Sequence, residues 1–127
     1  SPAAGGHARP VVGTLVRTFG APAEAGPAQG LTFQAAPGAR VVSPCRGRVA
    51  FAGPFRSFGE LLILDCGGGE HAVLTGLGRL DAASGQRVLA GEPIGVLPDT
   101  PGPAHLYLEL RRNGEAVDPR PWLAGRD

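Results

Sequence analysis

The chain has 127 residues, of which 43% are hydrophobic, and it carries a formal net charge of +1 at pH 7. This length fits one domain with its own core, since domains cluster at about 100–150 residues. The near-neutral charge and the spread of short apolar runs exclude a disordered tail and a strongly basic nucleic-acid binder. No apolar run approaches the ~20 residues of a membrane helix, so we expect no membrane insertion of this domain.

The first nine residues are rich in Pro, Gly and Ala and lack an initiator Met. We interpret residues 1–9 as linker from a longer precursor or as an artificial boundary, and residues 10–127 as one domain. A signal peptide cannot be judged from such a segment.

Glycines and prolines, 21 and 13 of them, interrupt every candidate helix, and the segments between them are short and rich in Val, Leu, Ile and Phe. This pattern predicts an all-β fold, mostly antiparallel and with minimal helix. We expect strands at residues 11–17, 31–35, 40–42, 47–52, 60–65, 71–75, 93–96, 105–112 and 115–117. Asn113-Gly114 predicts a two-residue type I′ hairpin turn, because both turn positions require positive φ. Residues 119–123 predict a short terminal turn in which Trp122 closes the end of the sheet.

The two cysteines, Cys45 and Cys66, are too few and too far apart for a zinc knuckle. Residues 53–59 predict a hairpin loop between two strands, and antiparallel pairing across this loop brings position 45 close to position 66. A disulfide requires Cα atoms within roughly 7 Å, which this register allows. The pattern leaves a Cys45–Cys66 disulfide and a pair of reduced thiols as alternatives.

Three segments carry a resemblance to a known family. Residues 30–49 read GLTFQAAPGARVVSPCRGRV, residues 85–95 read GQRVLAGEPIG, and residues 105–123 read HLYLELRRNGEAVDPRPWL. The first looks like a Gly-hydrophobic-Asp strand followed by a small-Pro-Gly turn and a V-x-A-x-x-x-G-x-V strand. The chain therefore resembles the LytM/lysostaphin zinc peptidases, and its tail is similar to EnvC-type murein hydrolase activators. The resemblance implies the duplicated-hybrid-motif-like β-sandwich of that family.

Active members of this family hold zinc with the His and Asp of H-x-G-x-D and the second His of a final H-x-H. The resemblance puts Ala28, Thr32 and Tyr107 at these three ligand positions. Ala28 has no donor atom, and the other two offer only neutral hydroxyls at pH 7. His105 matches a non-ligand His that assists the reaction, and a further active-site His falls near Val73. We therefore expect no catalytic zinc, no other cofactor and no enzymatic activity.

Side chains alternate along a strand, so His105, Tyr107, Glu109 and Arg111 share one face while the intervening leucines face the core. The resemblance makes this face the floor of the former catalytic groove. We expect a partner-binding groove formed by Tyr107, Arg111, Phe58, Thr32, Gln29 and His105. Glu109 and Arg111 could instead pair on a solvated sheet face, Phe58 could fold back onto the core, and His105 could be a structural histidine.

The resemblance to EnvC-type proteins implies a function. It implies a periplasmic, non-catalytic LytM domain that binds and activates an N-acetylmuramoyl-L-alanine amidase during cell division, after a coiled coil that lies outside this chain. A peptidoglycan-binding module without an amidase partner and an active zinc endopeptidase of cell-wall peptides are the alternatives. Residues 88–95 would also fit a biotinyl or lipoyl carrier, but such carriers attach their cofactor to a Lys and this chain has none.

Overall fold

The computed structural model describes residues 6–124. The regular secondary structure of the described part is almost entirely β-strand, with one short helix. Its elements are β1 (Thr14–Arg17), β2 (Leu31–Ala35), β3 (Arg40–Val42), β4 (Gly47–Pro54), β5 (Glu60–Gly67), β6 (Glu70–Leu77), β7 (Arg79–Leu80), β8 (Arg87–Val88), β9 (Pro93–Val96), β10 (Ala104–Arg112), β11 (Glu115–Val117) and α1 (Pro119–Leu123). The strand pairs are antiparallel, which confirms the predicted fold class.

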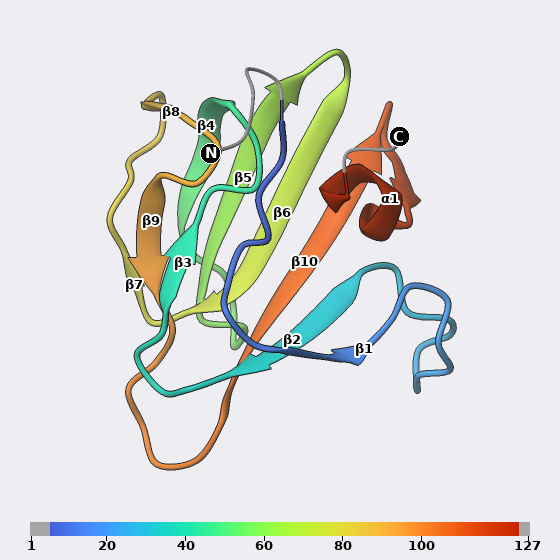
Figure 1. Cartoon of the computed structure of the whole chain (residues 1–127), viewed down its shortest axis with the longest axis vertical. Helices are drawn as coiled ribbons and strands as arrows, with labels where there is room; N and C mark the ends of the chain where they lie inside the picture. Colours follow the sequence, from blue (N-terminus) through green and yellow to red (C-terminus); the bar gives the residue numbers. More distant parts are fainter. Residues whose placement is uncertain (1–5, 125–127) are drawn as a thin grey trace.

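One large sheet positions the features described below. Its strand order is β1-β2-β10-β6-β5-β4-β8, with β11 added beside β10, and a smaller sheet has the order β3-β9-β7. Figure 1 shows β10 between β2 and β6, with the small sheet beyond β4. β10, late in the chain, thus lies next to β2, near its start, and residues far apart in sequence meet across this pair.

The core follows from alternation along the central strands. Leu106, Leu108 and Leu110 of β10 are fully buried, and Phe33 of β2 is 1% exposed. Burial of each such side chain stabilises the fold by about 1.5–3 kcal/mol. The leucines of β10 therefore face the core, and the side chains between them face outward.

The predicted strands are all present, with shifted ends. β1 begins at Thr14 rather than at residue 11, because Pro10 accepts a backbone hydrogen bond from Val42 instead of continuing the β1–β2 ladder. β7 and β8 were not predicted, since two-residue strands carry no periodic signal.

The end of the chain forms a helix rather than the predicted turn. Asp118 caps α1 by accepting a hydrogen bond from the Arg120 amide, and Pro119 occupies the first helical turn, where its missing N–H costs nothing. Trp122 is 1% exposed, and its indole N–H donates to Glu70 Oε1 at 3.1 Å. The D-P-R-P sequence is therefore a helix start that the sequence analysis overlooked.

The predicted hairpin turn is confirmed. Asn113 and Gly114 have φ values of 53° and 84°, and Arg112 pairs with Glu115 directly across them. Both central residues are left-handed, as a type I′ turn requires.

The cysteines form a disulfide. The Cα atoms of Cys45 and Cys66 lie 5.8 Å apart, and the bond ties the start of β4 to the end of β5. Of the two alternatives that the sequence left open, the structure contains the bridge.

The segment before β1 contacts both α1 and the segment before β4. The His7 ring stacks on Trp122 with 4.0 Å between ring centroids, and the Ala8 amide donates to Pro44 O. Residues 1–5 lie outside the described part, so the linker boundary at residue 10 stays a prediction. Among the described residues, no helix is both long enough and apolar enough to cross a membrane.

Candidate functional site

A row of side chains crosses the outer face of the large sheet. Arg17 of β1 is the Cα partner of Thr32 of β2, Thr32 is the partner of Tyr107 of β10, and Tyr107 is the partner of Thr75 of β6. Directly paired residues of antiparallel strands project from the same face with Cβ atoms about 4.5–5.5 Å apart. The register therefore assembles one polar floor from four strands.

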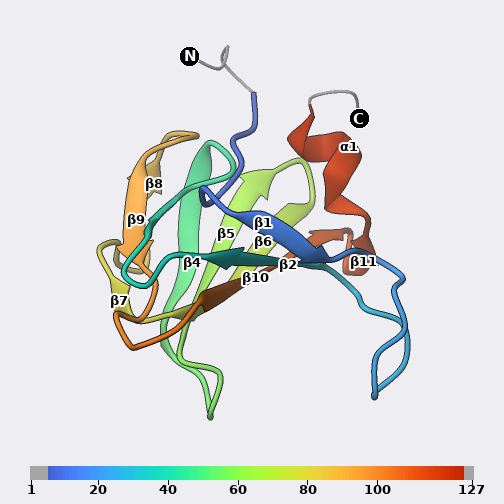
Figure 2. The same ribbon diagram turned by 60° about the horizontal axis from the view of Figure 1, so that its bottom comes forward.

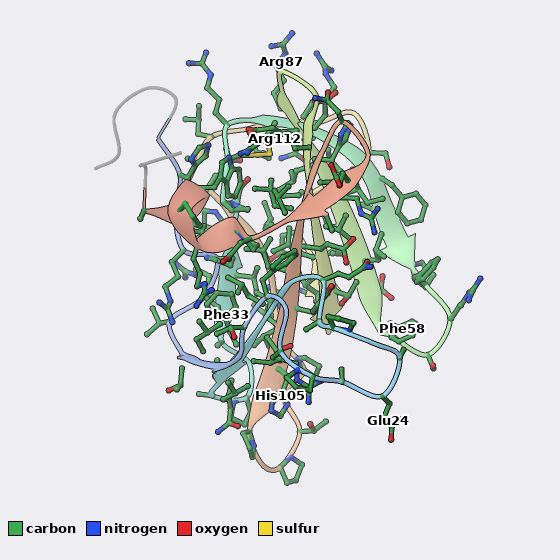
Figure 3. All side chains as sticks on the ribbon, turned by 90° about the vertical axis from the view of Figure 1, so that its right-hand side faces the viewer. Glu24, Phe33, Phe58, Arg87, His105 and Arg112 are labelled. Carbon is green, nitrogen blue, oxygen red and sulfur yellow. A yellow bond between two sulfur atoms is a disulfide. The ribbon has the colours of Figure 1, made fainter. Side chains whose placement is uncertain are left out.

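A groove of about 580 Å³ lies over this floor. Its walls come from two connections, the β1–β2 segment with Ala23 to Gln29 and the β4–β5 loop with Phe58. Figure 2 shows both connections projecting from the same side of the sheet, and in Figure 3 the segment that carries Glu24 extends toward Phe58. Thr32 and Tyr107 complete the lining, together with Arg17 at one end.

A chain of hydrogen bonds runs along β10 beside the groove. The Tyr107 hydroxyl donates to Glu109 Oε1 at 2.5 Å, and Arg111 Nε donates to Glu109 Oε2 at 2.6 Å. Arg111 also donates to the Gly114 carbonyl at 3.0 Å and to Gln29 Oε1 at 3.3 Å. The Glu109 side chain is 13% exposed and that of Arg111 37%, so Glu109 is an enclosed acceptor between two donors rather than a solvated partner of Arg111 alone.

The environment of Tyr107 keeps its phenol protonated. Burial of the ring, and then the hydrogen bond that the hydroxyl donates to Glu109, raise the pKa of Tyr107 well above its ordinary value. The ring also lies against Gly30, where a Cβ would stand 2.8–2.9 Å from the ring and hydroxyl atoms. Tyr107 is therefore a fixed hydrogen-bond donor.

The positions that the resemblance equates with zinc ligands do not fit a catalytic zinc. Ala28, Thr32 and Tyr107 all line the groove, so they converge as ligand positions should. However, Ala28 has no donor atom, Thr32 has a neutral hydroxyl, and the phenol of Tyr107 is committed to Glu109. Within residues 6–124 no group of three or more His, Cys, Asp and Glu side chains could hold a metal ion.

The predicted groove residues fall into three places. Gln29, Thr32, Phe58 and Tyr107 line the groove together, and Phe58 is 56% exposed rather than folded onto the core. Arg111 lines an adjoining depression of about 460 Å³ that shares Pro27, Ala28 and Gln29 with the groove.

The third place belongs to His105 alone. It is exposed at the far end of β10, opposite Gln34, and lines neither hollow.

Sequence reasoning missed several residues of this surface. Arg17 and the small residues Ala23 and Ala25 line the groove, and Thr75 pairs with Tyr107 on its floor. His71 of β6 is the Cα partner of Arg111. The strands were predicted, but only their pairing register brings these residues to β10.

The fold defines the class of protein. The chain superimposes on the antimicrobial peptidase lysostaphin from Staphylococcus simulans with a TM-score of 0.81 and 21% identity, over 99% of this chain and 56% of that chain. This likeness establishes a lysostaphin-like fold.

The family follows from the sequence itself. The profile of peptidase family M23 matches residues 26–119, so the chain belongs to peptidase family M23. It is 34% identical to the murein hydrolase activator EnvC of Escherichia coli K12 over 98 residues, 75% of this chain and 23% of EnvC. It is 32% identical to a lipoprotein NlpD/LppB homolog of Pseudomonas aeruginosa, over 98% of this chain and 42% of that protein. The chain thus spans less than half the length of these relatives.

Proposed function

We propose that this chain is a non-catalytic M23 domain that binds a periplasmic N-acetylmuramoyl-L-alanine amidase and activates it for peptidoglycan cleavage in cell division. The observation that carries the proposal is the groove floor, which contains Thr32 and a protonated Tyr107, the residues that the resemblance equates with metal ligands of active relatives. The similarity to a murein hydrolase activator supports the same reading.

The groove has the chemistry of a protein-binding surface. Phe58 and the small side chains of Ala23 and Ala25 offer apolar contact, while Gln29 and Arg17 offer polar groups at the edges. Tyr and Arg are the residues most often found as binding hot spots. Such a lining accepts a partner segment with an apolar face and flanking polar groups.

Activation is a population shift in this proposal. The groove binds a segment of the amidase that blocks the amidase active site, and it binds that segment only in its displaced position. The equilibrium between blocked and open amidase then shifts toward the open state. The size of the shift equals the difference in the groove's affinity for the two positions of the segment. No chemical step takes place on this chain.

The proposal includes a location and a larger protein. The domain acts in the periplasm and follows a coiled coil that lies outside this chain. The Cys45–Cys66 disulfide supports an oxidising compartment, where such bonds persist.

Stimulation of an amidase tests the proposal. The purified chain, added to a purified amidase and dye-labelled sacculi, is expected to raise the rate of dye release. The double variant Tyr107→Ala/Arg111→Ala removes the donor and the cation beside the groove and should abolish this increase.

Arg79→Ala is the matched control, because Arg79 pairs with Asp81 two residues away just as Arg111 pairs with Glu109. Full stimulation by the double variant, with its fold confirmed by circular dichroism, would mean that the amidase binds elsewhere on this chain. No stimulation together with direct binding to sacculi would favour a peptidoglycan-binding module.

Metal analysis tests the non-catalytic part independently. The chain purified at neutral pH should contain no stoichiometric zinc, because Ala28, Thr32 and Tyr107 supply no anionic or imidazole ligand. Bound zinc that is lost in Tyr107→Phe would restore the endopeptidase alternative.

A further inference from the structure

An open pocket of about 490 Å³ lies at the other end of the β4–β5 pair from Phe58. It is formed by the start of β4, the end of β5 and the β8 segment, and it contains the side chains of Arg46, Arg48 and Arg87. Figure 3 shows Arg87 at the end of the molecule opposite to His105. The pocket shares no residue with the groove.

Among the described residues, the three pocket arginines have no carboxylate partner, whereas four other arginines do. Arg79, Arg111, Arg112 and Arg120 are each ion-paired with a carboxylate. Within residues 6–124, Arg46 and Arg87 have no side-chain hydrogen bond or ion pair, and Arg48 donates only to the Gly85 carbonyl at 2.9 Å. Most of their N–H groups are therefore free to donate to a ligand, and a guanidinium fork matches a carboxylate in a bidentate geometry.

The main chain of this pocket is held in place before any ligand arrives. The Cys45–Cys66 disulfide joins the residue before Arg46 to the residue after Asp65. Gly47 lets the two strands approach closely, because a Cβ there would overlap the Asp65 carbonyl oxygen. Because the backbone is already rigid, ligand binding loses little backbone entropy. The conformational entropy lost on binding comes mainly from the long arginine side chains.

The remaining side chains define the class of ligand. Asp65 lies in the same pocket and accepts a hydrogen bond from the Gly67 amide through Oδ1, and no ion pair with Arg48 forms although the two residues are Cα partners. Leu89 is 61% exposed at the pocket edge. The pocket is positively charged overall and also contains one carboxylate, so it suits a small ligand that carries several carboxylates and an ammonium group.

We propose that this pocket is a second binding site, which takes a short peptide with free carboxylates and a free amine. Arg46, Arg48 and Arg87 bind its carboxylates, Asp65 receives its ammonium group, and Leu89 packs on its aliphatic part. The choice of a cell-wall stem peptide as the natural ligand rests on the proposed function. The need for free carboxylates and a free amine rests on the pocket residues alone.

Titration of the intact chain with a soluble tripeptide, L-Ala-γ-D-Glu-meso-diaminopimelate, followed by NMR chemical shifts, tests this site. Shifts are expected at residues 46–48 and 65–67, and the same tripeptide with amidated carboxyl groups should bind at least about tenfold more weakly. Arg46→Gln/Arg87→Gln should weaken binding by about tenfold or more, while Arg79→Gln leaves it unchanged. Thermal unfolding of each variant checks its fold.

Two further arms identify the ligand class and the site. Asp65→Asn should weaken binding of the tripeptide and strengthen binding of inorganic phosphate, because it removes a negative charge. Tyr107→Ala/Arg111→Ala should bind the tripeptide normally, and since the titration contains no amidase, its result does not depend on amidase activation.

The proposal is overturned if the amidated tripeptide binds equally well, if Arg46→Gln/Arg87→Gln binds like the wild type, or if only vesicles of phosphatidylglycerol bind.

Discussion

Tyr107 shows how one side chain changes the chemistry of a site. Its ring rests on Gly30, and its hydroxyl is held by Glu109, which is held in turn by Arg111. The three groups satisfy one another without a metal, and the Glu109 carboxylate is not left unpaired. The same arrangement leaves Gln29 bound to Arg111 at the edge of the groove.

Tyr107 should ionise at unusually high pH. It is the only tyrosine of the chain, so the ultraviolet absorbance of the phenolate reports it directly. Burial and the hydrogen bond to Glu109 raise the pKa of the folded state above the unfolded value near ~10. The resulting stability is fully present below pH ~10 and is lost as the pH rises through the folded pKa.

Tyr107→Phe provides the control for this prediction. The chain has no lysine and its cysteines are bonded, so few other groups titrate in this window. The free energy of unfolding, measured in urea, should fall more steeply above pH ~10 for the wild type than for Tyr107→Phe. Equal slopes, or a phenol that titrates at its ordinary pH, would disprove the assigned environment.

At the scale of elements, the β4–β5 pair links the two surfaces. Its loop carries Phe58 to the groove, and its other end carries Arg48 and Asp65 to the arginine pocket. The disulfide closes that other end. The hairpin therefore needs covalent support most where the pocket is, because Arg46 and Arg48 are exposed and contribute little packing of their own.

Reduction of the disulfide should destabilise the fold markedly. The bonded cysteines are separated by 21 residues, a loop for which the entropy of the cross-link is worth about 3 kcal/mol. Urea unfolding curves of the oxidised and reduced protein measure this difference. The curve of Cys45→Ala/Cys66→Ala should not respond to reductant, and equal midpoints for oxidised and reduced wild type would contradict the prediction.

At the scale of the whole molecule, the segment before β1 meets α1. His7 stacks on Trp122 and donates from Nδ1 to the Trp122 carbonyl at 2.8 Å, while Trp122 donates to Glu70 of β6. Residues before β1 and after β11 thus close the same end of the large sheet.

His7→Ala should lower the free energy of unfolding by about 1 kcal/mol, the usual worth of a stacked aromatic pair. The fluorescence of Trp122, the only tryptophan, follows both the unfolding and the local change. His105→Ala is a suitable control, because His105 is exposed and has no side-chain partner among the described residues. Equal losses for the two variants would mean that the stacking does not contribute.

The sequence alone determined the strands other than β7 and β8, the Asn113-Gly114 turn and the outward face of β10. Alternation around Leu106, Leu108 and Leu110 assigned Tyr107, Glu109 and Arg111 to that face, since the period of a strand is a local property. The Asn113-Gly114 turn was equally local, because two residues decide it. The resemblance added the family, which the match to residues 26–119 establishes.

Only the tertiary structure decided what these residues touch. The contact of Gln29 with Arg111 and the row from Arg17 to Thr75 depend on strand order and register, which join segments far apart in the chain. The arginine pocket, formed at three strand ends, carries no motif at all. Such sites are invisible in a single sequence, because the free energy that brings their strands together is contributed by the buried leucines on the opposite face, not by the site residues themselves.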